Sequence, residues 1–364
     1  MLNLSTGEQL QGRCHVDWQH GEKSGISFKE RTLDLKNAYK HLACKSARQS
    51  TTDFLDILGI QWSGDEKDKP YEFVFDPLGV RFDLSNMATL AKVVVSNKPS
   101  RVSSIIEQLD QVQTDNSLHP ALASELHGKL VYTQAQTFGR AAIPAIREIG
   151  NRAHEFGKHI ELSQRLKLAL EFVKEHLRTA VPRTISANDN SRNVSIFTDG
   201  SFEKEKAQWG FFVHDASTNE RIIAGGTVPD ELVQYWIGTV GKQIITQVEL
   251  LAVLIARRFL GNKCAGRKVI WWIDNDAAKD SLVSGHSDSL GSMSVIYSFY
   301  ELERLSPSYL WFARVPSYSN VADEPSRGKV KEAASKFGAQ IVDVSISQRD
   351  IKELIGFSAR HKNL

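Results

Sequence analysis

The sequence predicts an α/β protein in which a mixed β-sheet covered by helices occupies the C-terminal half. Three apolar segments joined by short turns predict strands over residues 194–199, 209–214 and 221–227. Helical and strand patterns then alternate along the chain: 244–259 (helix), 268–274 (strand), 277–283 (helix), 293–305 (helix) and 309–314 (strand). Strands joined by short turns pair antiparallel and strands separated by helices run parallel, so this order implies a mixed sheet with flanking helices.

Composition places the chain among ordinary globular proteins. Its 364 residues are enough for two or three domains, and 41% are hydrophobic and 24% charged. The N-terminus lacks the pattern of a signal peptide, and no apolar run approaches the ~20 residues of a membrane helix. We therefore expect a soluble, intracellular protein, with nucleus and cytoplasm both open. The cysteines Cys14, Cys44 and Cys264 have neither the spacing of a zinc site nor that of a disulfide framework.

The N-terminal half shows three patterns. Alternating apolar and polar residues around a Pro-Leu-Gly turn predict a β-hairpin over residues 71–84. Apolar residues at helical spacing over 98–177 predict a bundle of three or four helices. The polar, turn-rich stretch 182–191 predicts a linker between this segment and the sheet.

Four carboxylates stand at separate places in the C-terminal half, and three of them lie in settings that are unfavourable for an isolated charge. Asp199 and Asp274 end apolar strands, and Glu249 lies on a helix whose apolar face includes Ala252. Asp323 follows in a loop-rich stretch. Acidic side chains are costly beside apolar surface unless a cation neutralises them. Mg²⁺ suits this role because it binds carboxylate oxygens and keeps water ligands for chemistry.

These carboxylates are expected to converge on one metal site. If the strands that carry Asp199 and Asp274 are neighbours, both side chains lie at the same rim of the sheet. Four carboxylates without cations would raise one another's pKa, whereas two Mg²⁺ or Mn²⁺ ions about 4 Å apart would neutralise them. Two such ions also clamp a phosphodiester for in-line attack, which predicts a nuclease. Each carboxylate taken alone is more typical of a strand end or a helix cap bonded to backbone, whereas four in this order of elements are not expected by chance.

The order of the local motifs resembles the ribonuclease H domain of retroelement reverse transcriptases. The matching segments are Thr198-Asp199-Gly200-Ser201, Gln247-Val248-Glu249-Leu250, Ile273-Asp274-Asn275 and Asn320-Val321-Ala322-Asp323. The resemblance covers about residues 194–330 and implies a ribonuclease H-like five-stranded mixed sheet. It also implies hydrolysis of the RNA strand of RNA–DNA hybrids. In this family Asp199 would be shared by both ions, with Glu249 and Asp274 flanking one ion and Asp323 on the other. The segments 314–320 and 322–327 resemble the tyrosine-recombinase retroelement group in particular.

Polar residues beside the carboxylates are candidates for contacts with phosphates and 2′-hydroxyls. They are Ser201, Gln247, Asn275, Ser317, Asn320 and Arg314. We favour Gln247 and Asn275, because the others are equally typical of ordinary surface residues. Many members of the family carry a mobile histidine shortly before the last aspartate, but here the only histidine between Asp274 and Asp323 is His286. A helper histidine for product release is therefore not expected.

The first part of the chain resembles a reverse transcriptase palm that has lost its core. Leu33–Leu42 resembles the first catalytic motif, with Asp34 at the metal-binding position. No Asp-Asp dipeptide occurs in the sequence, and only 44 positions separate Asp34 from the next matching segment at Leu78. A polymerase needs that second pair of carboxylates, so polymerase activity is predicted to be absent. Asp34 then reads better as a capping residue that opens a short helix.

Together these patterns predict a fragment of a retroelement polyprotein. The expected parts are a truncated palm remnant (1–97), a helical thumb or connection segment (98–183), a linker (184–193), the ribonuclease H-like domain (194–330) and a C-terminal extension (331–364). The expected substrate is an RNA–DNA hybrid, and a separate reverse transcriptase subunit is a possible partner. Two alternatives stay open: a catalytically inactive nucleic-acid-binding remnant, and a resolvase- or transposase-type DNA nuclease of the same fold.

Overall fold

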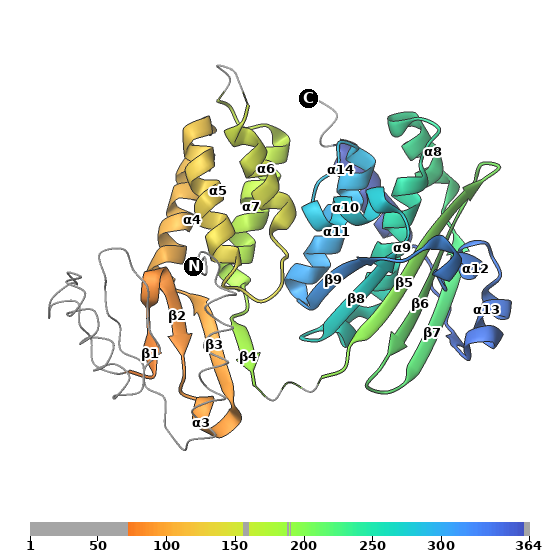
Figure 1. The fold of residues 1–364 in the computed structure, drawn as a ribbon. Helices are drawn as coiled ribbons and strands as arrows, with labels where there is room; N and C mark the ends of the chain where they lie inside the picture. The colour runs from red at the N-terminus through yellow and green to blue at the C-terminus, as the bar shows by residue number, and fades with distance from the viewer. Residues whose placement is uncertain (1–71, 156–159, 188, 190, 360–364) are drawn as a thin grey trace, which may run out of the picture. The chain divides into compact units, whose positions relative to one another are not determined.

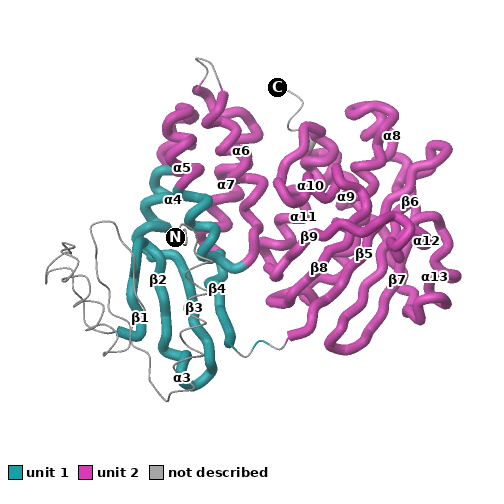
Figure 2. Tube along the Cα trace, in the orientation of Figure 1, with its two compact units in different colours: residues 1–108, 129–138, 180–190 teal, residues 109–128, 139–179, 191–364 magenta. Residues whose placement is uncertain are grey.

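The computed structural model describes residues 72–155, 160–187, 189 and 191–359. The palm-like motif with Asp34, and the cysteines Cys14 and Cys44, lie outside the described residues. The chain forms two compact units, and their boundary passes through the helices α4 (Pro99–Thr114) and α5 (Pro120–Gln134) (Figure 2). Unit 1 comprises residues 1–108, 129–138 and 180–190, and unit 2 comprises residues 109–128, 139–179 and 191–364.

Unit 1 contains a four-stranded antiparallel sheet in the order β1-β2-β3-β4. The strands are β1 (Val74–Phe75), β2 (Val80–Asp83), β3 (Lys92–Asn97) and β4 (Arg183–Ser186), and the short helix α3 (Met87–Leu90) precedes β3. The predicted hairpin is confirmed, because β1 pairs with β2 across the turn Pro77–Gly79. Alternate residues of these strands form a small core together with Leu84 and with Met87 of α3: Phe75, Val80, Phe82, Val93 and Val95.

The secondary structure of the predicted linker differs from the expectation. Instead of an irregular connection, its first residues form β4, in which Ile185 pairs with Val93 of β3. Thr184 and Ile185 are β-branched and suit a strand. The turn-forming residues that follow them masked this preference, and the partner strand lies about ninety positions earlier in the sequence.

The helical segment predicted over residues 98–177 is confirmed. It consists of α4, α5, α6 (Ile143–Ala153) and α7 (Gln164–Thr179). Within unit 2, α6 and α7 pack on each other, and Lys174 of α7 forms an ion pair with Asp110 of α4 at 2.7 Å. No helix in the described part of the chain is both long and apolar enough to cross a membrane.

Unit 2 is built around a six-stranded mixed sheet in the order β10-β7-β6-β5-β8-β9 (Figure 1). The strands are β5 (Val194–Glu203), β6 (Lys206–Asp215), β7 (Glu220–Thr227), β8 (Lys268–Ile273), β9 (Tyr309–Arg314) and β10 (Gln340–Ile341). β5, β6 and β7 pair antiparallel, whereas β8 and β9 run parallel to β5. The five predicted strands and their mixed pairing are confirmed. The expected count of five is corrected to six, because the two-residue strand β10 adds to β7.

Seven helices accompany this sheet among the residues described. They are α8 (Asp230–Val240), α9 (Ile245–Leu260), α10 (Asp276–Ser284), α11 (Leu290–Leu305), α12 (Asp323–Ser326), α13 (Val330–Phe337) and α14 (Gln348–Ala359). The central helix α9 is buried over most of its length, including Val248 and Leu251. α8 was not among the predicted helices, although its buried Leu232 and Trp236 stand at helical spacing.

The two faces of the sheet have different neighbours. Ile196, Trp271 and alternate residues beside them form the main core with α9 and α11, and we call this side the α9 face. On the opposite side, Phe212 and Ile223 pack on α13, and we call this the α13 face. Because side chains alternate along a strand, each strand residue belongs to one of these faces.

The described part of the C-terminal extension belongs to unit 2. β10 pairs with β7 and α13 covers part of the sheet. α14 packs on α11, with the rings of Tyr297 and Phe357 at 5.3 Å, and its Asp350 forms an ion pair with Arg258 of α9. The helix α7 also reaches α11, where Phe172 meets Tyr297 edge-on at 5.8 Å.

Candidate active site

Asp199 lies within β5 on the α13 face. Sequence reasoning placed it at the end of its strand, but β5 continues to Glu203 because β6 pairs along its whole length. The parallel neighbour β8, in contrast, stops at Ile273, opposite Thr198. Asp199 therefore stands where the sheet loses one strand. A Cβ on the following Gly200 would lie 2.7 Å from the backbone nitrogen of Glu249, so a glycine is required for the close approach of α9.

Three of the four predicted carboxylates converge. Asp199 of β5, Glu249 of the first turns of α9 and Asp274 just after β8 each offer one oxygen, and these oxygens lie within 4.8 Å of one another. Asp199 and Glu249 are each 4% exposed, and Asp274 is half-buried. The arrangement is close enough to bind a divalent ion.

Burial and mutual repulsion dominate the electrostatics of this cluster. Burial, together with the charges of Asp274 and Asp323, raises the pKa of Asp199 to about 7 in spite of a hydrogen bond from Ser326. Burial also raises the pKa of Glu249 well above its usual value, as do the charges of Asp199 and Asp274. The protein itself therefore supplies too little positive charge for its own carboxylates.

Two oxygens of the cluster lack a hydrogen-bond partner among the described residues. They are Oε2 of Glu249 and Oδ1 of Asp274, and both are inaccessible to solvent. A buried carboxylate oxygen without a partner is costly. An oxygen-binding cation such as Mg²⁺ or Mn²⁺ would satisfy both atoms and offset the clustered charge. The residues present thus fit the metal that the sequence predicted.

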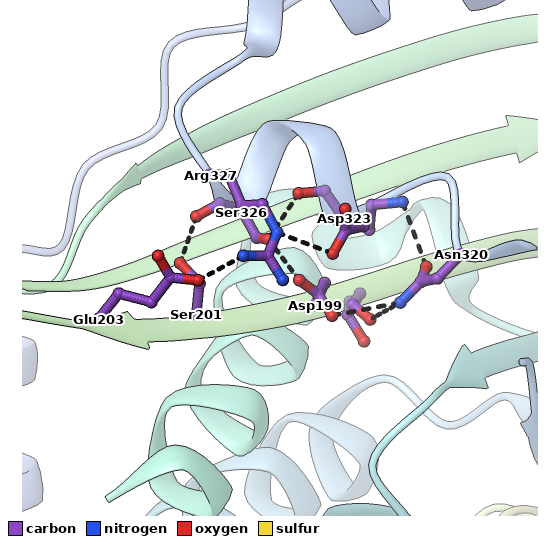
Figure 3. A network of polar contacts seen from close by, with 9 residues as sticks. Asp199, Ser201, Glu203, Asn320, Asp323, Ser326 and Arg327 are labelled. Atoms are coloured by element: carbon purple, nitrogen blue, oxygen red, sulfur yellow. Dashed lines mark hydrogen bonds and ion pairs between the residues drawn. The ribbon is translucent and has the colours of Figure 1, made fainter. Parts of the chain in front are cut away.

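The short helix α12 holds Asp199 from the other side (Figure 3). The hydroxyl of Ser326 donates to Oδ2 of Asp199, and the amide of Asn320 donates to its Oδ1 at 3.4 Å. Ser201, which lies two residues further along β5, donates to the carbonyl of Ser326 at 2.6 Å. A Cβ on Gly210 of β6 would lie 2.4 Å from the nitrogen of Ser326, so this glycine admits α12 to the sheet.

Asp323, the fourth predicted carboxylate, is the first residue of α12 and does not belong to the group within 4.8 Å. It lies near enough to raise the pKa of Asp199. Its Oδ1 accepts from Nε of Arg327 at 3.0 Å, and Arg327 also pairs with Glu203 at the end of β5 (Figure 3). The structure therefore brings Asp323 to the border of the cluster, where an arginine neutralises it.

Three of the side chains that were predicted to contact nucleic acid are buried and form hydrogen bonds inside the protein. Gln247 is 2% exposed, and its amide donates to Ser289 and Ser292 of the α11 region. Asn320 donates to Asp199 and to the carbonyl of Thr198, and Ser201 is occupied by Ser326. These side chains organise the site from within.

The remaining predicted contacts lie nearer the surface. Asn275 caps α10, with its Oδ1 accepting from the nitrogen of Ala278 at 2.9 Å. Ser317 is exposed, and the exposed Arg314 forms an ion pair with Asp276 at 3.2 Å. His286 follows the C-terminal glycine of α10, and its ring pairs with Asp288 at 3.4 Å.

Ser326 is the functional residue that sequence reasoning missed. Its hydroxyl contacts Asp199 across 127 positions of sequence. The available signal was its spacing of three residues from Asp323, which puts both residues in the same helical turn.

Comparisons with known proteins give structural similarities of low identity. No family model matches the sequence, and no curated protein is significantly similar to it. Among solved structures, the RNase H1 of the archaeon Halobacterium salinarum is 15% identical, with a TM-score of 0.29, over 40% of this chain and 99% of that one. LC11-RNase H1 in complex with an RNA/DNA hybrid, from a compost metagenome, is 16% identical, with a TM-score of 0.29, over 38% and 98%.

A foamy viral protease–reverse transcriptase in complex with double-stranded DNA is 10% identical, with a TM-score of 0.29, over 79% of this chain and 56% of that one. At these identities and scores, the similarities assign no activity. The fold and the site are taken from the strand order, the register and the contacts of the chain itself.

Proposed function

We propose that the chain is a metal-dependent endonuclease that hydrolyses the RNA strand of RNA–DNA hybrids. The observation that carries this proposal is the convergence of Asp199, Glu249 and Asp274, each of which offers one oxygen within 4.8 Å of the others. In the same cluster, Oε2 of Glu249 and Oδ1 of Asp274 are buried and have no hydrogen-bond partner among the described residues. Such a cluster is costly to the folded protein unless it binds cations. Hard divalent ions held by carboxylates suit attack on a phosphodiester.

The proposed ligands of two Mg²⁺ or Mn²⁺ ions are the three clustered carboxylates and Asp323. When bound, the ions would supply an activated water and charge stabilisation for the leaving oxygen. The charges of Asp274 and Asp323 both act on Asp199, and the charge of Asp199 acts on Glu249, which suits a ligand shared by both ions.

The chain's own side chains prepare these ligands. Ser326 and Asn320 hold Asp199 in one orientation, and the backbone N–H of Gly200 donates to Glu249. Arg327 fixes one oxygen of Asp323. Groups that orient ligands in this way reduce the reorganisation needed when an ion binds.

The preference for a hybrid rests on the resemblance of the four acidic motifs to the ribonuclease H domain of retroelement reverse transcriptases. Ser317 and Arg314 are the proposed contacts to the substrate backbone, because both are exposed and the charge of Arg314 acts on Glu249. Asn275 retains its amide nitrogen for a similar contact, since its cap of α10 uses only the oxygen.

The same resemblance leads us to propose that the chain is the nuclease portion of a retroelement polyprotein. Residues 1–97 would be the palm remnant, 98–183 the thumb or connection segment, 184–193 the linker and 194–330 the nuclease. No polymerase activity is expected, since the sequence contains no Asp-Asp dipeptide. Any polymerisation would come from a separate subunit.

The test is cleavage of a hybrid whose RNA strand carries a label, with Mg²⁺ or with EDTA. We expect cleavage by the wild type, with 5′-phosphate ends on the products, and a loss of at least about a hundredfold in Asp274→Asn, because the ions supply several kcal/mol of stabilisation in such sites. Asp280→Asn is the matched control, because Asp280 is an exposed carboxylate of α10 outside the cluster.

Duplex DNA and a branched DNA junction belong in the same assay. Preferential cleavage of either would replace the hybrid by a DNA substrate. Equal cleavage of the hybrid by wild type and Asp274→Asn, or cleavage by neither, would refute the enzymatic proposal.

A further inference from the structure

The two strands at one edge of the six-stranded sheet carry aromatic side chains on the α13 face. α12 and α13 contact β6 and β7 on this face, where Pro325 approaches Gly210 and Gly225. β8 and β9 lie on the other side of β5 from β6 and β7. We call the surface that β8 and β9 present on the α13 side of the sheet the β8–β9 face. It consists of Lys268, Ile270 and Trp272 of β8 and Tyr309, Trp311 and Ala313 of β9.

The residues of the β8–β9 face are paired across the two parallel strands. Ile270 pairs with Trp311 and Trp272 pairs with Ala313, so their side chains lie next to one another on the same side of the sheet. Trp311 is 70% exposed and Tyr309 is 38% exposed, whereas Trp272 is half-buried with its ring stacked on Phe197 at 5.8 Å. An indole ring that remains mostly in water leaves a large apolar surface uncovered.

The face is continuous with the candidate active site. Asp274 follows Trp272 by two positions and Asp199 follows Phe197 by two positions, so the carboxylates continue the same side of the two neighbouring strands. Trp311 is level with Ile270, which is four residues before Asp274. At 3.3 Å per residue this spacing is about 13 Å. About four stacked nucleotides at 3.4 Å each would span it.

The chemistry of the face suits nucleobases better than a second protein surface. β8 and β9 contain no acidic residue, and Lys268 stands beside Tyr309 in the register. Flat exposed rings bind bases of any sequence by stacking, and a cation nearby favours the phosphates. The exposed parts of the two rings and of Ile270 offer roughly 300 to 400 Å². This area is well below the ~800 Å² per partner of a stable protein interface.

We propose that the β8–β9 face is a stacking platform for single-stranded nucleic acid that extends from the candidate active site, with Trp311 as its main contact. The inference builds on the proposed function, because the single strand is taken to continue one strand of the hybrid. Hybrids with a single-stranded extension would therefore bind more tightly than blunt ones.

The test is fluorescence anisotropy of the full chain, in EDTA, with three labelled probes. One probe is a blunt 12-base-pair hybrid, and the other two carry an eight-nucleotide oligothymidine extension at one end or at the other. We expect at least one extension to tighten binding about fivefold or more, the effect of stacking a single base. Trp311→Ala should remove this gain and leave the affinity for the blunt hybrid unchanged, whereas Trp311→Phe should keep most of the gain.

Leu305→Ala is the matched control, because Leu305 is an equally exposed apolar residue at the end of α11, outside the face. Equal binding of blunt and extended hybrids by the wild type would overturn the proposal, as would an extension effect that survives in Trp311→Ala. A wild-type dimer in sedimentation that Trp311→Ala dissociates, without any change in extension binding, would assign the face to a protein partner and also overturn it. Because binding is measured without metal, a gain from the extension in a protein that fails to cleave hybrid would keep the platform and reject the nuclease.

Discussion

Two buried carboxylates of unit 2, Glu303 and Glu249, have opposite environments. Glu303 of α11 is 2% exposed, and its Oε1 accepts from Nε of Arg257 at 2.6 Å. Its Oε2 accepts from the nitrogen and the hydroxyl of Ser308 at 3.1 and 2.9 Å. Glu249 of α9 is 4% exposed, faces two other carboxylates and keeps one oxygen without a partner among the described residues.

This difference separates two roles of a buried carboxylate, which can be recognised by whether the fold supplies its partners. Where the fold supplies its own cation and donors, as Arg257 and Ser308 do for Glu303, the carboxylate joins α9, α11 and the start of β9. Where the fold gathers carboxylates and leaves an oxygen unsatisfied, the missing partner is one that the chain does not encode.

The largest effect is expected from Arg257→Ala. The substitution leaves Glu303 buried without its cation, which typically costs about 3 to 5 kcal/mol of unfolding free energy. Urea unfolding followed by circular dichroism measures it. Arg258→Ala is the matched control, since this neighbouring arginine is a quarter exposed and pairs with the partly exposed Asp350, so it should lose at most about 1 kcal/mol. A loss below ~1 kcal/mol in Arg257→Ala would contradict the structural role of this pair.

The next effect is a dependence of stability on pH in the metal-free protein. The folded-state pKa of Asp199 is raised from its usual 3.8 to about 7, so the folded protein holds a proton that the unfolded chain releases in this window. Stability from this group is therefore greatest at low pH and is lost as pH rises toward 7. Between pH 5 and 7, wild type should lose about 2 to 3 kcal/mol more than Asp199→Asn in EDTA. Parallel pH profiles for the two proteins would argue against a buried, uncompensated Asp199.

Asp274→Asn is expected to raise the free energy of unfolding, by less than Arg257→Ala lowers it. Removing one charge from the cluster relieves repulsion, and substitutions at strained functional sites commonly raise stability by about 0.5 to 2 kcal/mol. The measurement is urea unfolding at pH 8 in EDTA. Destabilisation by more than ~1 kcal/mol would mean that Asp274 supports the fold as Glu303 does.

Much of this fold follows from local patterns in the sequence. The strands β5 to β9 and the helices α9 to α11 are each visible as apolar runs or helical spacing, and three of the four carboxylates mark the elements that converge. β10 escaped prediction because a two-residue strand has no period, and β4 because its pairing with β3 is a tertiary choice.

The hydrogen bonds inside the site could not be predicted from such local patterns. Gln247 reads as a donor for substrate because it stands two residues before Glu249. It instead faces α11, since helix residues two apart point to different sides. The contacts of Asn320 and Ser326 with Asp199 depend on how α12 docks on the sheet, which is a property of the folded chain alone.

The smallest effect is a change in metal affinity that depends on the ion pair between Arg327 and Asp323. Arg327→Ala removes a positive charge from the border of the cluster, and a partly exposed pair is worth at most about 1 kcal/mol, so Mn²⁺ affinity should rise two- to fivefold. Glu203→Gln should have the opposite sign, because Arg327 then loses its other partner and binds Asp323 more closely. Changes of the same sign in both variants, measured by calorimetric titration, would exclude this competition between arginine and metal.

The most direct test of the central claim is a calorimetric titration of Mg²⁺ and of Mn²⁺ into the metal-free full chain. Wild type and Asp280→Asn should bind the ions with equal affinity, whereas Asp274→Asn and Glu249→Gln should each lose most of the binding. Absence of binding to the wild type, or equal binding by Asp274→Asn, would contradict the account of this cluster as a divalent-metal site.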